Sequence, residues 1–305
     1  MDRLLNHLLY LAGRTFVWVV QLFPLRFVAW TGRMAGLLAF YLDWRHRRVA
    51  VGQLDCFLKH AGRKGDGVKM GREHFQRLGE NYLSAVKTSG MKPEALEKHI
   101  EFRGIDLFEK PVTTDSPGEW KNGWIIAIGH FGNFELYARS LSSLNGRVGA
   151  ATYRGLNQPG LNRLLHELRA SSGVRFFDRR KEVKALRKLM TDGSVVLGLL
   201  ADQSAGSGML MDFLGDKCLC STAPAIFSQR YHCRLATGIC YRTGPAKWVV
   251  EFEKEIPTFS NGSKRSVEEV TADVNTAFEK AIHKDPLNWF WVHDRWKRFK
   301  KKRKR

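Results

Sequence analysis

Short apolar runs alternate with amphipathic stretches between residues 124 and 200, and this alternation limits the possible folds more than any other feature of the sequence. The run Trp124–Ile128 is typical of a strand buried on both faces, because it is apolar throughout and bounded by glycines. Strands and helices in alternation predict an α/β fold with a mostly parallel central sheet flanked by helices. The expected strands here are Trp124–Ile128, Val148–Tyr153, Val174–Phe177 and Val195–Leu200, and the expected helices are 161–170 and 182–190.

Further elements are expected on both sides of this region. A helix over residues 69–90 carries apolar side chains at helical spacing and ends at Gly90. No long stretch rich in Pro, Gly or Ser divides the chain, so we expect a single α/β domain over residues 43–296. Additional strands are expected at 100–103, 239–242 and 248–252, a short helix at 105–109, and a helix at 267–283.

The amino-terminal segment 1–42 forms a second predicted unit. From Leu4 to Leu42 it has no acidic residue, but arginines interrupt it before any uncharged run reaches the ~18–20 residues of a simple transmembrane span. Pro24 divides it into two expected helices, 3–22 and 26–42, that together predict a helical membrane anchor, either spanning the bilayer or lying on it. The alternative is a pair of buried core helices. The basic residues 45–48 favour the anchor and place the following domain on the cytoplasmic side.

The formal net charge of +20 implies an anionic partner. Eight of the last nine residues are Lys or Arg, so residues 297–305 are expected to form a basic tail that contacts anionic lipid or remains solvated. The rest of the excess is spread over the chain. Composition leaves three partner classes open: nucleic acid, an anionic membrane surface and a phosphorylated substrate.

The five cysteines indicate neither a disulfide framework nor a metal centre. Their number is odd and their density low, which fits a reducing compartment. Cys218 and Cys220 are one residue apart, whereas zinc knuckles space their cysteines by two, and no second close pair follows. We therefore expect no metal site.

The segment Gly129–Glu135 directly follows the first expected strand of the alternating region, and active residues of open α/β folds gather at such strand ends. Two glycines permit a tight turn that leaves His130 on a loop and Glu135 in the first helical turn. A carboxylate on one imidazole nitrogen leaves the other free to take a proton from an alcohol. We interpret His130 and Glu135 as a general-base pair, with the backbone amides of Gly132 and Asn133 as oxyanion donors. An unrelated loop histidine and glutamate remain the alternative.

Several ordered segments make the chain resemble a known family. They are the seven residues Gly129–Glu135, then Tyr153–Pro159, Ala201–Gln203, Asp212–Gly215 and Trp289–Lys297. Together they resemble the bacterial lipid A biosynthesis acyltransferases, the lauroyl and myristoyl transferases within the lysophospholipid acyltransferase superfamily. Phe134 stands where the family often has Trp, and Gly155 replaces a usual proline.

The resemblance implies an enzyme of the inner (cytoplasmic) membrane that faces the cytoplasm. It implies transfer of an acyl chain from acyl carrier protein or acyl-coenzyme A to a hydroxyl of a lipid A precursor, without a cofactor. Chain length, donor carrier, acceptor hydroxyl and oligomeric state stay open.

Four further residues are candidates for acceptor binding. Arg154 follows a strand, where a guanidinium suits a phosphate or sugar acid, and Arg175 is a weaker candidate of the same kind. Asp202 and Gln203 follow the strand 195–200 and are expected to contact either acceptor hydroxyls or the other side of the reacting groups. The alternatives are a surface salt bridge for Arg154 and a turn-forming role for Asp202.

Two other functions compete with this interpretation. A nucleic-acid-binding protein fits the charge, but no nucleic-acid motif supports it, and we expect no nucleic-acid partner. An acyltransferase of another lipid, such as a glycerolipid, is the closer alternative. The sequence lacks the Pro-Glu-Gly motif common in glycerolipid members, which counts against it.

Overall fold

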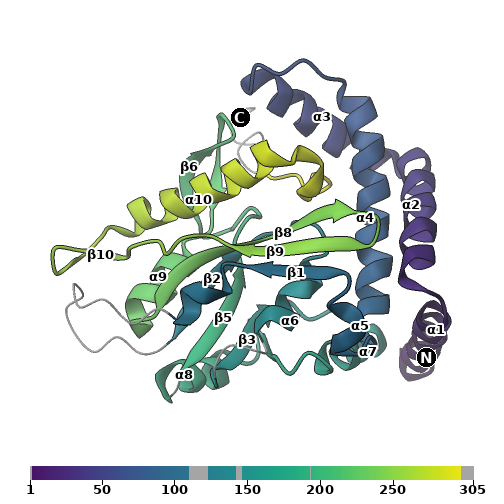
Figure 1. The fold of residues 1–305 in the computed structure, drawn as a ribbon, viewed down its shortest axis with the longest axis horizontal. Helices are drawn as coiled ribbons and strands as arrows, with labels where there is room; N and C mark the ends of the chain where they lie inside the picture. The colour runs from purple at the N-terminus through teal and green to yellow at the C-terminus, as the bar shows by residue number, and fades with distance from the viewer. Residues whose placement is uncertain (1, 110–122, 142–145, 193, 297–305) are drawn as a thin grey trace.

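A seven-stranded sheet forms the centre of the molecule (Figure 1). The computed structural model describes residues 2–109, 123–141, 146–192 and 194–296. All neighbouring strands in the sheet are parallel except β8 and β9, so the predicted α/β fold with a mostly parallel sheet is confirmed. The strand order is β1 (Ile100–Arg103), β9 (Lys247–Phe252), β8 (Arg234–Gly244), β2 (Trp124–Ile128), β5 (Val195–Leu200), β3 (Val148–Tyr153) and β4 (Arg175–Asp178).

Helices cover both faces of the sheet, and the strand β2 shows why. Its side chains alternate between two apolar clusters: Ile125 and Ala127 belong to one, and Trp124, Ile126 and Ile128 to the other. Every residue of β2 is buried, so a continuous apolar run was the correct signal for a central strand. The helices are α1 (Asp2–Leu22), α2 (Leu25–Leu42), α3 (Trp44–His60), α4 (Gly67–Ser89), α5 (Pro93–Leu96), α6 (Tyr137–Leu141), α7 (Pro159–Ala170), α8 (Val183–Asp192), α9 (Ala223–Tyr231) and α10 (Val267–Lys284), with short 3-10 turns η1 (Ile105–Glu109), η2 (Phe134–Leu136) and η3 (Pro286–Asn288).

Several elements, among them two helices and two small antiparallel ribbons, were not expected from the sequence. Helix α3 contains the basic residues 45–48 in its first turns, where they had been interpreted only as a flank of the membrane segment. Helix α9 was not expected either. A small antiparallel hairpin pairs β6 (Met209–Phe213) with β7 (Asp216–Cys220), and its strands are half-exposed and mixed in polarity, which hides their period. A second small ribbon pairs β10 (Phe259–Ser260) with β11 (Ser263–Lys264).

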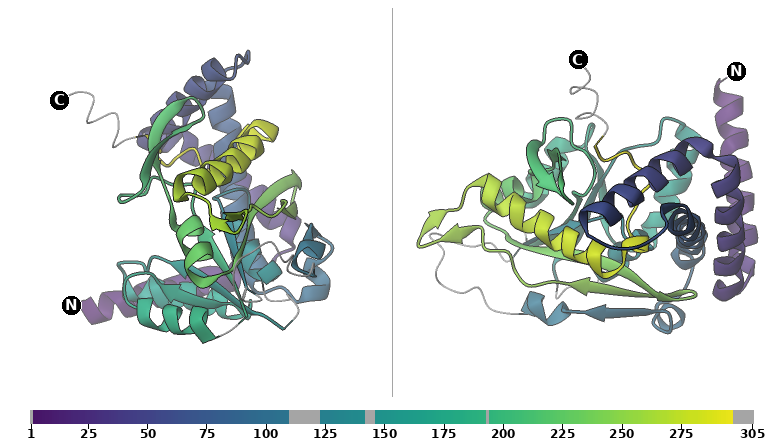
Figure 2. Two further views of the ribbon diagram at one scale, coloured as in Figure 1. Left: turned by 90° about the vertical axis from the view of Figure 1, so that its left-hand side faces the viewer. Right: turned by 90° about the horizontal axis from the view of Figure 1, so that it is seen from above.

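Helices α1 and α2 lie along the edge of the molecule beside α4 and α7 (Figures 1 and 2). The backbones of α2 and α4 nearly touch: a Cβ on Gly32 would lie 2.6 Å from the carbonyl oxygen of Gly79, and a Cβ on Gly36 even closer to that of Phe75. One face of α2 is thus buried while its other face remains exposed. Among the described residues, no helix has both the length and the apolar character that crossing a membrane requires.

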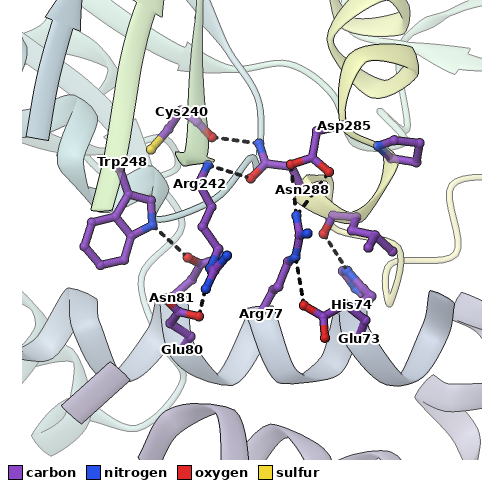
Figure 3. A network of polar contacts seen from close by, with 12 residues as sticks. Glu73, His74, Arg77, Glu80, Asn81, Cys240, Arg242, Trp248, Asp285 and Asn288 are labelled. Carbon is purple, nitrogen blue, oxygen red and sulfur yellow. Dashed lines mark hydrogen bonds and ion pairs between the residues drawn. The ribbon is translucent and has the colours of Figure 1, made fainter. Parts of the chain in front are cut away.

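A buried polar network fixes α4 against the sheet (Figure 3). The carboxylate of Glu80 is fully buried and accepts hydrogen bonds from the Arg242 guanidinium at 2.8 Å and the Ala246 amide at 3.0 Å. The side chain of Asn81 accepts a bond from the Trp248 indole at 3.0 Å. This buried carboxylate holds α4 in one position against the sheet, because a shift of the helix would leave the carboxylate and its donors without hydrogen bonds. This network positions the helix that forms one wall of the site.

Candidate active site

Two side chains at the carboxyl ends of neighbouring strands meet at the centre of the sheet edge. In the register of β2 and β5, Ile128 lies opposite Leu200, and both His130 and Asp202 follow two residues later. The Nδ1 atom of His130 lies 2.8 Å from Oδ1 of Asp202, and the His130 amide donates to Oδ2 at 2.8 Å. The carboxylate thereby fixes both the backbone and the ring of His130.

Asp202 is buried, with 1% of its side chain exposed, and has a third partner in the Trp289 indole, which donates at 2.8 Å. Burial by itself raises the pKa of Asp202, but the charge of His130 and the hydrogen bonds from His130 and Trp289 outweigh it and keep the pKa below its usual value. The residue is therefore a buried anion with its hydrogen bonds satisfied. The three donors that enclose this carboxylate come from the protein itself, so the structure gives Asp202 a role beside His130 and not the expected contact with acceptor hydroxyls.

Glu135 does not hold His130. It lies in η2, in the first helical turn as expected, but its carboxylate accepts two hydrogen bonds from the Arg169 guanidinium, at 2.9 and 2.5 Å. Arg169 comes from the last turn of α7 and lies over the ring of Phe176. The packing of α7 thus brings an arginine to Glu135, which no local sequence pattern predicts. Asp202, and not Glu135, orients the ring of His130.

The turn between β2 and η2 also differs from the expected oxyanion site. Gly132 has a φ of +52°, which glycine adopts readily, and its amide donates to the Asn288 carbonyl at 3.0 Å. That amide is occupied, so the prediction of a Gly132 oxyanion donor is wrong. Asn133, whose backbone amide was the other predicted donor, is 1% exposed, and neither the nitrogen nor the oxygen of its side-chain amide has a partner among the described residues. An unpaired buried amide costs free energy unless a ligand binds it.

A pocket of about 210 Å³ adjoins His130. Apolar side chains of α4 and α7 form its walls, together with the turn after β2 and the segment after α10. His130, Asn133, Glu135 and Arg169 also border it, so the polar groups of the site share one cavity with the apolar surface. The apolar lining comprises Leu78, Tyr82, Ala85, Val86, Phe134, Leu136, Ala138, Leu165, Leu168, Leu287, Trp289 and Phe290.

The ring of His130 is held between two aromatic side chains. Its centroid lies 5.0 Å from that of Phe134 and 5.6 Å from that of Phe290. With Nδ1 engaged by Asp202, the Nε2 atom is the nitrogen left without a partner among the described residues. A ring fixed by packing and by one hydrogen bond presents that nitrogen in a single orientation.

The remaining predicted residues come from three different strands of the sheet. Arg154 follows β3 and is exposed at the same edge as His130, with no ion-pair partner among the described residues. Because β5 lies between β3 and β2, and strands are ~4.8 Å apart, this position is roughly 10 Å along the edge from β2. Gln203, half-buried, follows Asp202. Arg175 begins β4 beside Ala150, three residues before the carboxyl end of that strand, and its guanidinium lies over the ring of Phe177 at 5.4 Å, so its role at the site stays a prediction.

Comparison with protein families matches residues 1–298 to the bacterial lipid A biosynthesis acyltransferases. The chain belongs to this family. The resemblance inferred from the ordered motifs is thereby confirmed over nearly the whole chain. No curated protein sequence matches it.

Membership in the lipid A acyltransferase family implies an acyl donor and a lipid acceptor in general terms. Two contacts of the site were not predicted from the sequence: the Asp202–His130 hydrogen bond and the Arg169–Glu135 ion pair. One signal for the first was available, since both residues stand two positions beyond an apolar strand. The order of the strands, which makes β2 and β5 neighbours, was not available.

Proposed function

We propose that the chain transfers a fatty acyl group from an acyl-thioester donor to a hydroxyl of a lipid A precursor, with His130 as the general base. One observation carries this proposal: His130 is bound through Nδ1 to a buried carboxylate and borders an apolar pocket. Family membership supports acyl transfer in lipid A biosynthesis. The donor, the acceptor and the role of each residue are the proposal.

The proton follows a short route. Nε2 of His130 takes the proton of the acceptor hydroxyl as its oxygen attacks the thioester carbonyl carbon. The resulting imidazolium is stabilised by the negative charge of Asp202. When the tetrahedral intermediate collapses, the carbon–sulfur bond breaks and the leaving thiolate takes the proton from His130. An ester and a free thiol result, and the base is restored.

Asn133 is the donor that we assign to the oxyanion. Its buried amide has no partner among the described residues, and it borders the same pocket as His130. A side-chain amide already fixed in place stabilises developing negative charge without first having to reorganise. Replacing Asn133 by alanine is expected to lower kcat by roughly 10²-fold, with the donor KM little changed.

The apolar pocket suits the acyl chain of the donor. Burying methylene groups against its walls provides about 0.8 kcal/mol for each group. Such binding would bring the thioester carbon to the polar end of the cavity, where His130 and Asn133 lie. Both candidate donors, acyl carrier protein and acyl-coenzyme A, remain compatible with this arrangement.

The acceptor is proposed to be recognised through its anionic groups. Arg154 supports this, because it is exposed at the carboxyl edge of the sheet. Arg179 and Arg180 follow the neighbouring strand β4 at the same edge and are also exposed. A planar guanidinium matches the geometry of a phosphate with two hydrogen bonds. Three arginines along one edge suit a phosphorylated glycolipid better than a neutral one.

Attachment to the inner membrane, with the α/β domain on the cytoplasmic side, is part of the proposal. Large apolar side chains on the outer surface of α1, α2 and the start of α3 support it, since such a surface is typical of helices that lie in the membrane interface. The basic tail 297–305, which lies outside the described residues, would add contact with anionic lipid. The exposed apolar residues are Leu4, Leu5, Leu8, Leu11, Phe16, Trp18, Val19, Leu22, Phe23, Phe27, Trp30, Met34, Leu38, Tyr41, Leu42 and Trp44.

The decisive experiment is acyl transfer by the purified chain. Acyl carrier protein and coenzyme A thioesters are each mixed with a lipid A precursor or a lysoglycerolipid, and products are identified by mass spectrometry. We expect one added acyl chain on the lipid A precursor. Acylation of the glycerolipid alone would support the alternative acceptor, and DNA or RNA binding that survives moderate salt, without acyl transfer, would support the nucleic-acid alternative.

Membrane attachment has its own test. The full chain should float with vesicles that contain anionic lipid, and a variant with charged residues in place of Trp18, Phe27 and Trp30 should float much less. Those three side chains are exposed, so their replacement should leave folding intact. Recovery of the full chain in the soluble fraction without detergent would contradict the attachment.

A further inference from the structure

We propose that Cys56, His60 and Asp216 bind one transition-metal ion, with zinc as the ion that best matches the three ligands. The cysteine spacings in the sequence predicted no metal site. Cys56 and Asp216 are 160 residues apart, so their proximity is a product of the fold. None of the three borders the pocket beside His130, and the inference does not depend on the proposed function.

The ligand atoms are close enough to share an ion. One thiol sulfur, one imidazole nitrogen and one carboxylate oxygen all lie within 4.8 Å of one another. A point between three such atoms lies at most about 2.8 Å from each, and small side-chain rotations reach the usual zinc distances of ~2.0–2.3 Å. Sulfur with imidazole and carboxylate is a ligand set that zinc accepts and that magnesium and calcium disfavour.

The local structure leaves room for an ion there. The three side chains border a cavity of about 10 Å³, which is the size of one water-sized sphere. Cys56 and His60 are one helical turn apart at the end of α3, so both point from the same face of the helix. Figure 1 shows α3 and the β6–β7 hairpin at the same end of the molecule.

Gly215 in the hairpin turn accommodates the histidine. Its φ is +85°, and a Cβ at this position would lie 2.8 Å from Cγ of His60, so any other residue would displace the ring. The glycine belongs to Asp212–Gly215, a segment to which the proposed acyl-transfer mechanism assigns no role. The imidazole thus packs on the turn that directly precedes Asp216.

Binding would proceed without any redox change. The Cys56 thiol, which donates a weak hydrogen bond to Asp216 at 3.8 Å, would lose its proton to solvent as a sulfur–metal bond forms. His60 and Asp216 would each contribute a lone pair. The amide of Gln53 also borders the cavity, but its nitrogen already donates to the Trp291 carbonyl at 2.6 Å, so water would fill the fourth position.

The ion would join distant parts of the chain. It would tie α3 to the β6–β7 hairpin, whose residue Asp216 also accepts a hydrogen bond at its carbonyl from the Trp296 indole. The segment ending at Trp296 includes Trp289, which binds Asp202. We therefore expect the ion to stabilise the folded chain.

The first test is metal binding by the full chain without a polyhistidine tag. Zn²⁺ should bind at one ion per chain, and Co²⁺ should produce the absorption band of a thiolate–cobalt bond. Cys56→Ser should abolish that band, and His60→Gln should weaken Zn²⁺ affinity at least ~10-fold. The matched control is His46→Gln, an exposed histidine of the same helix, which should bind as the wild type does.

A second measurement uses only the wild-type chain. Cys56 is half-exposed while the other four cysteines are buried, so a thiol alkylating reagent should modify Cys56 first. Zn²⁺ should slow this modification at least ~10-fold, and Mg²⁺ should not. Absence of stoichiometric Zn²⁺ binding at micromolar concentrations would overturn the proposal. A cobalt–thiolate band that survives in Cys56→Ser, or alkylation unaffected by Zn²⁺, would overturn it equally.

Discussion

The imidazole of His130 and the carboxylate of Asp202 lie 2.8 Å apart although 72 residues of chain separate them. Strand β5 runs beside β2, and each residue stands two positions beyond the end of its strand. Asp202 is held from its other side by Trp289, which comes from the closing segment of the chain. Three distant segments thus build one base, and a single ring nitrogen remains for the acceptor.

Replacing His130 by alanine removes the proposed base. We expect kcat to fall by roughly 10²–10⁴-fold, the usual contribution of general base catalysis, with little change in Tm. Wild-type kcat/KM should decline as the pH is lowered and the imidazole is protonated, and this limb should be absent from any residual activity of the variant. Near-normal turnover, or an acyl group trapped on a Ser or Cys, would contradict direct transfer.

Asp202→Asn tests the orienting carboxylate. The amide keeps the shape but removes the negative charge beside the imidazolium, so kcat should fall by roughly 10³-fold or more. The acid limb of kcat/KM should also move to lower pH, because protonated His130 loses its stabilising neighbour. Circular dichroism and Tm serve as folding controls. A limb that stays in place would show that Asp202 does not act through His130.

Glu135→Gln distinguishes the role of Glu135 from that of Asp202. The change breaks the charge pairing with Arg169 at the pocket wall, so activity should lie between that of the wild type and that of His130→Ala. The acid limb should remain where it is in the wild type, since Glu135 does not contact His130. A limb displaced as far as in Asp202→Asn would assign Glu135 the orienting role instead.

Arg154→Lys tests the recognition of an anionic acceptor. Lysine keeps the charge but loses the paired donors of the guanidinium, so the acceptor KM should rise by about 10-fold while the donor KM stays constant. Arg154 is exposed, and the fold should be unaffected. The matched control is Arg230→Lys, an exposed arginine in the last turn of α9, which should leave both constants unchanged.

His74 should make the protein sensitive to acid. Burial lowers the pKa of this imidazole from 6.5 to about 4, although the Leu287 carbonyl acts in the opposite direction. Between these values the unfolded chain binds a proton and the folded chain does not. The stability that depends on neutral His74 is therefore fully present above pH 6.5. As the pH falls toward 4, the free energy of unfolding decreases by roughly 3 kcal/mol in total.

His74→Leu removes the titrating group. Its Tm should vary less between pH 6.5 and 4 than that of the wild type, when both are measured in the same detergent. His7→Gln, at an exposed position of α1, is the control and should keep the wild-type profile. If His74→Leu and the wild type lose stability equally over this range, other groups account for the acid sensitivity.

The sequence by itself determined the repeated elements of this protein. The strands Trp124–Ile128 and Val195–Leu200 have the predicted bounds, because a strand buried on both faces must be apolar throughout. The Pro24 break, the helix near residues 69–90 and the turn that carries His130 follow from equally local rules. Hydrophobic period, proline and glycine act on neighbouring residues, so they can be recognised without the fold.

Only the tertiary structure decided the partners of the charged groups. Glu135 is five residues from His130 in the chain, yet it binds Arg169, because α7 packs where its last turn reaches η2. Asp202 reaches His130 because β5 crosses back beside β2 after β3 and β4 have formed the edge of the sheet. Strand order and helix docking depend on contacts between residues far apart in the sequence. The partner of a buried charged group is the residue that those long-range contacts place beside it, so the neighbouring sequence does not identify that partner.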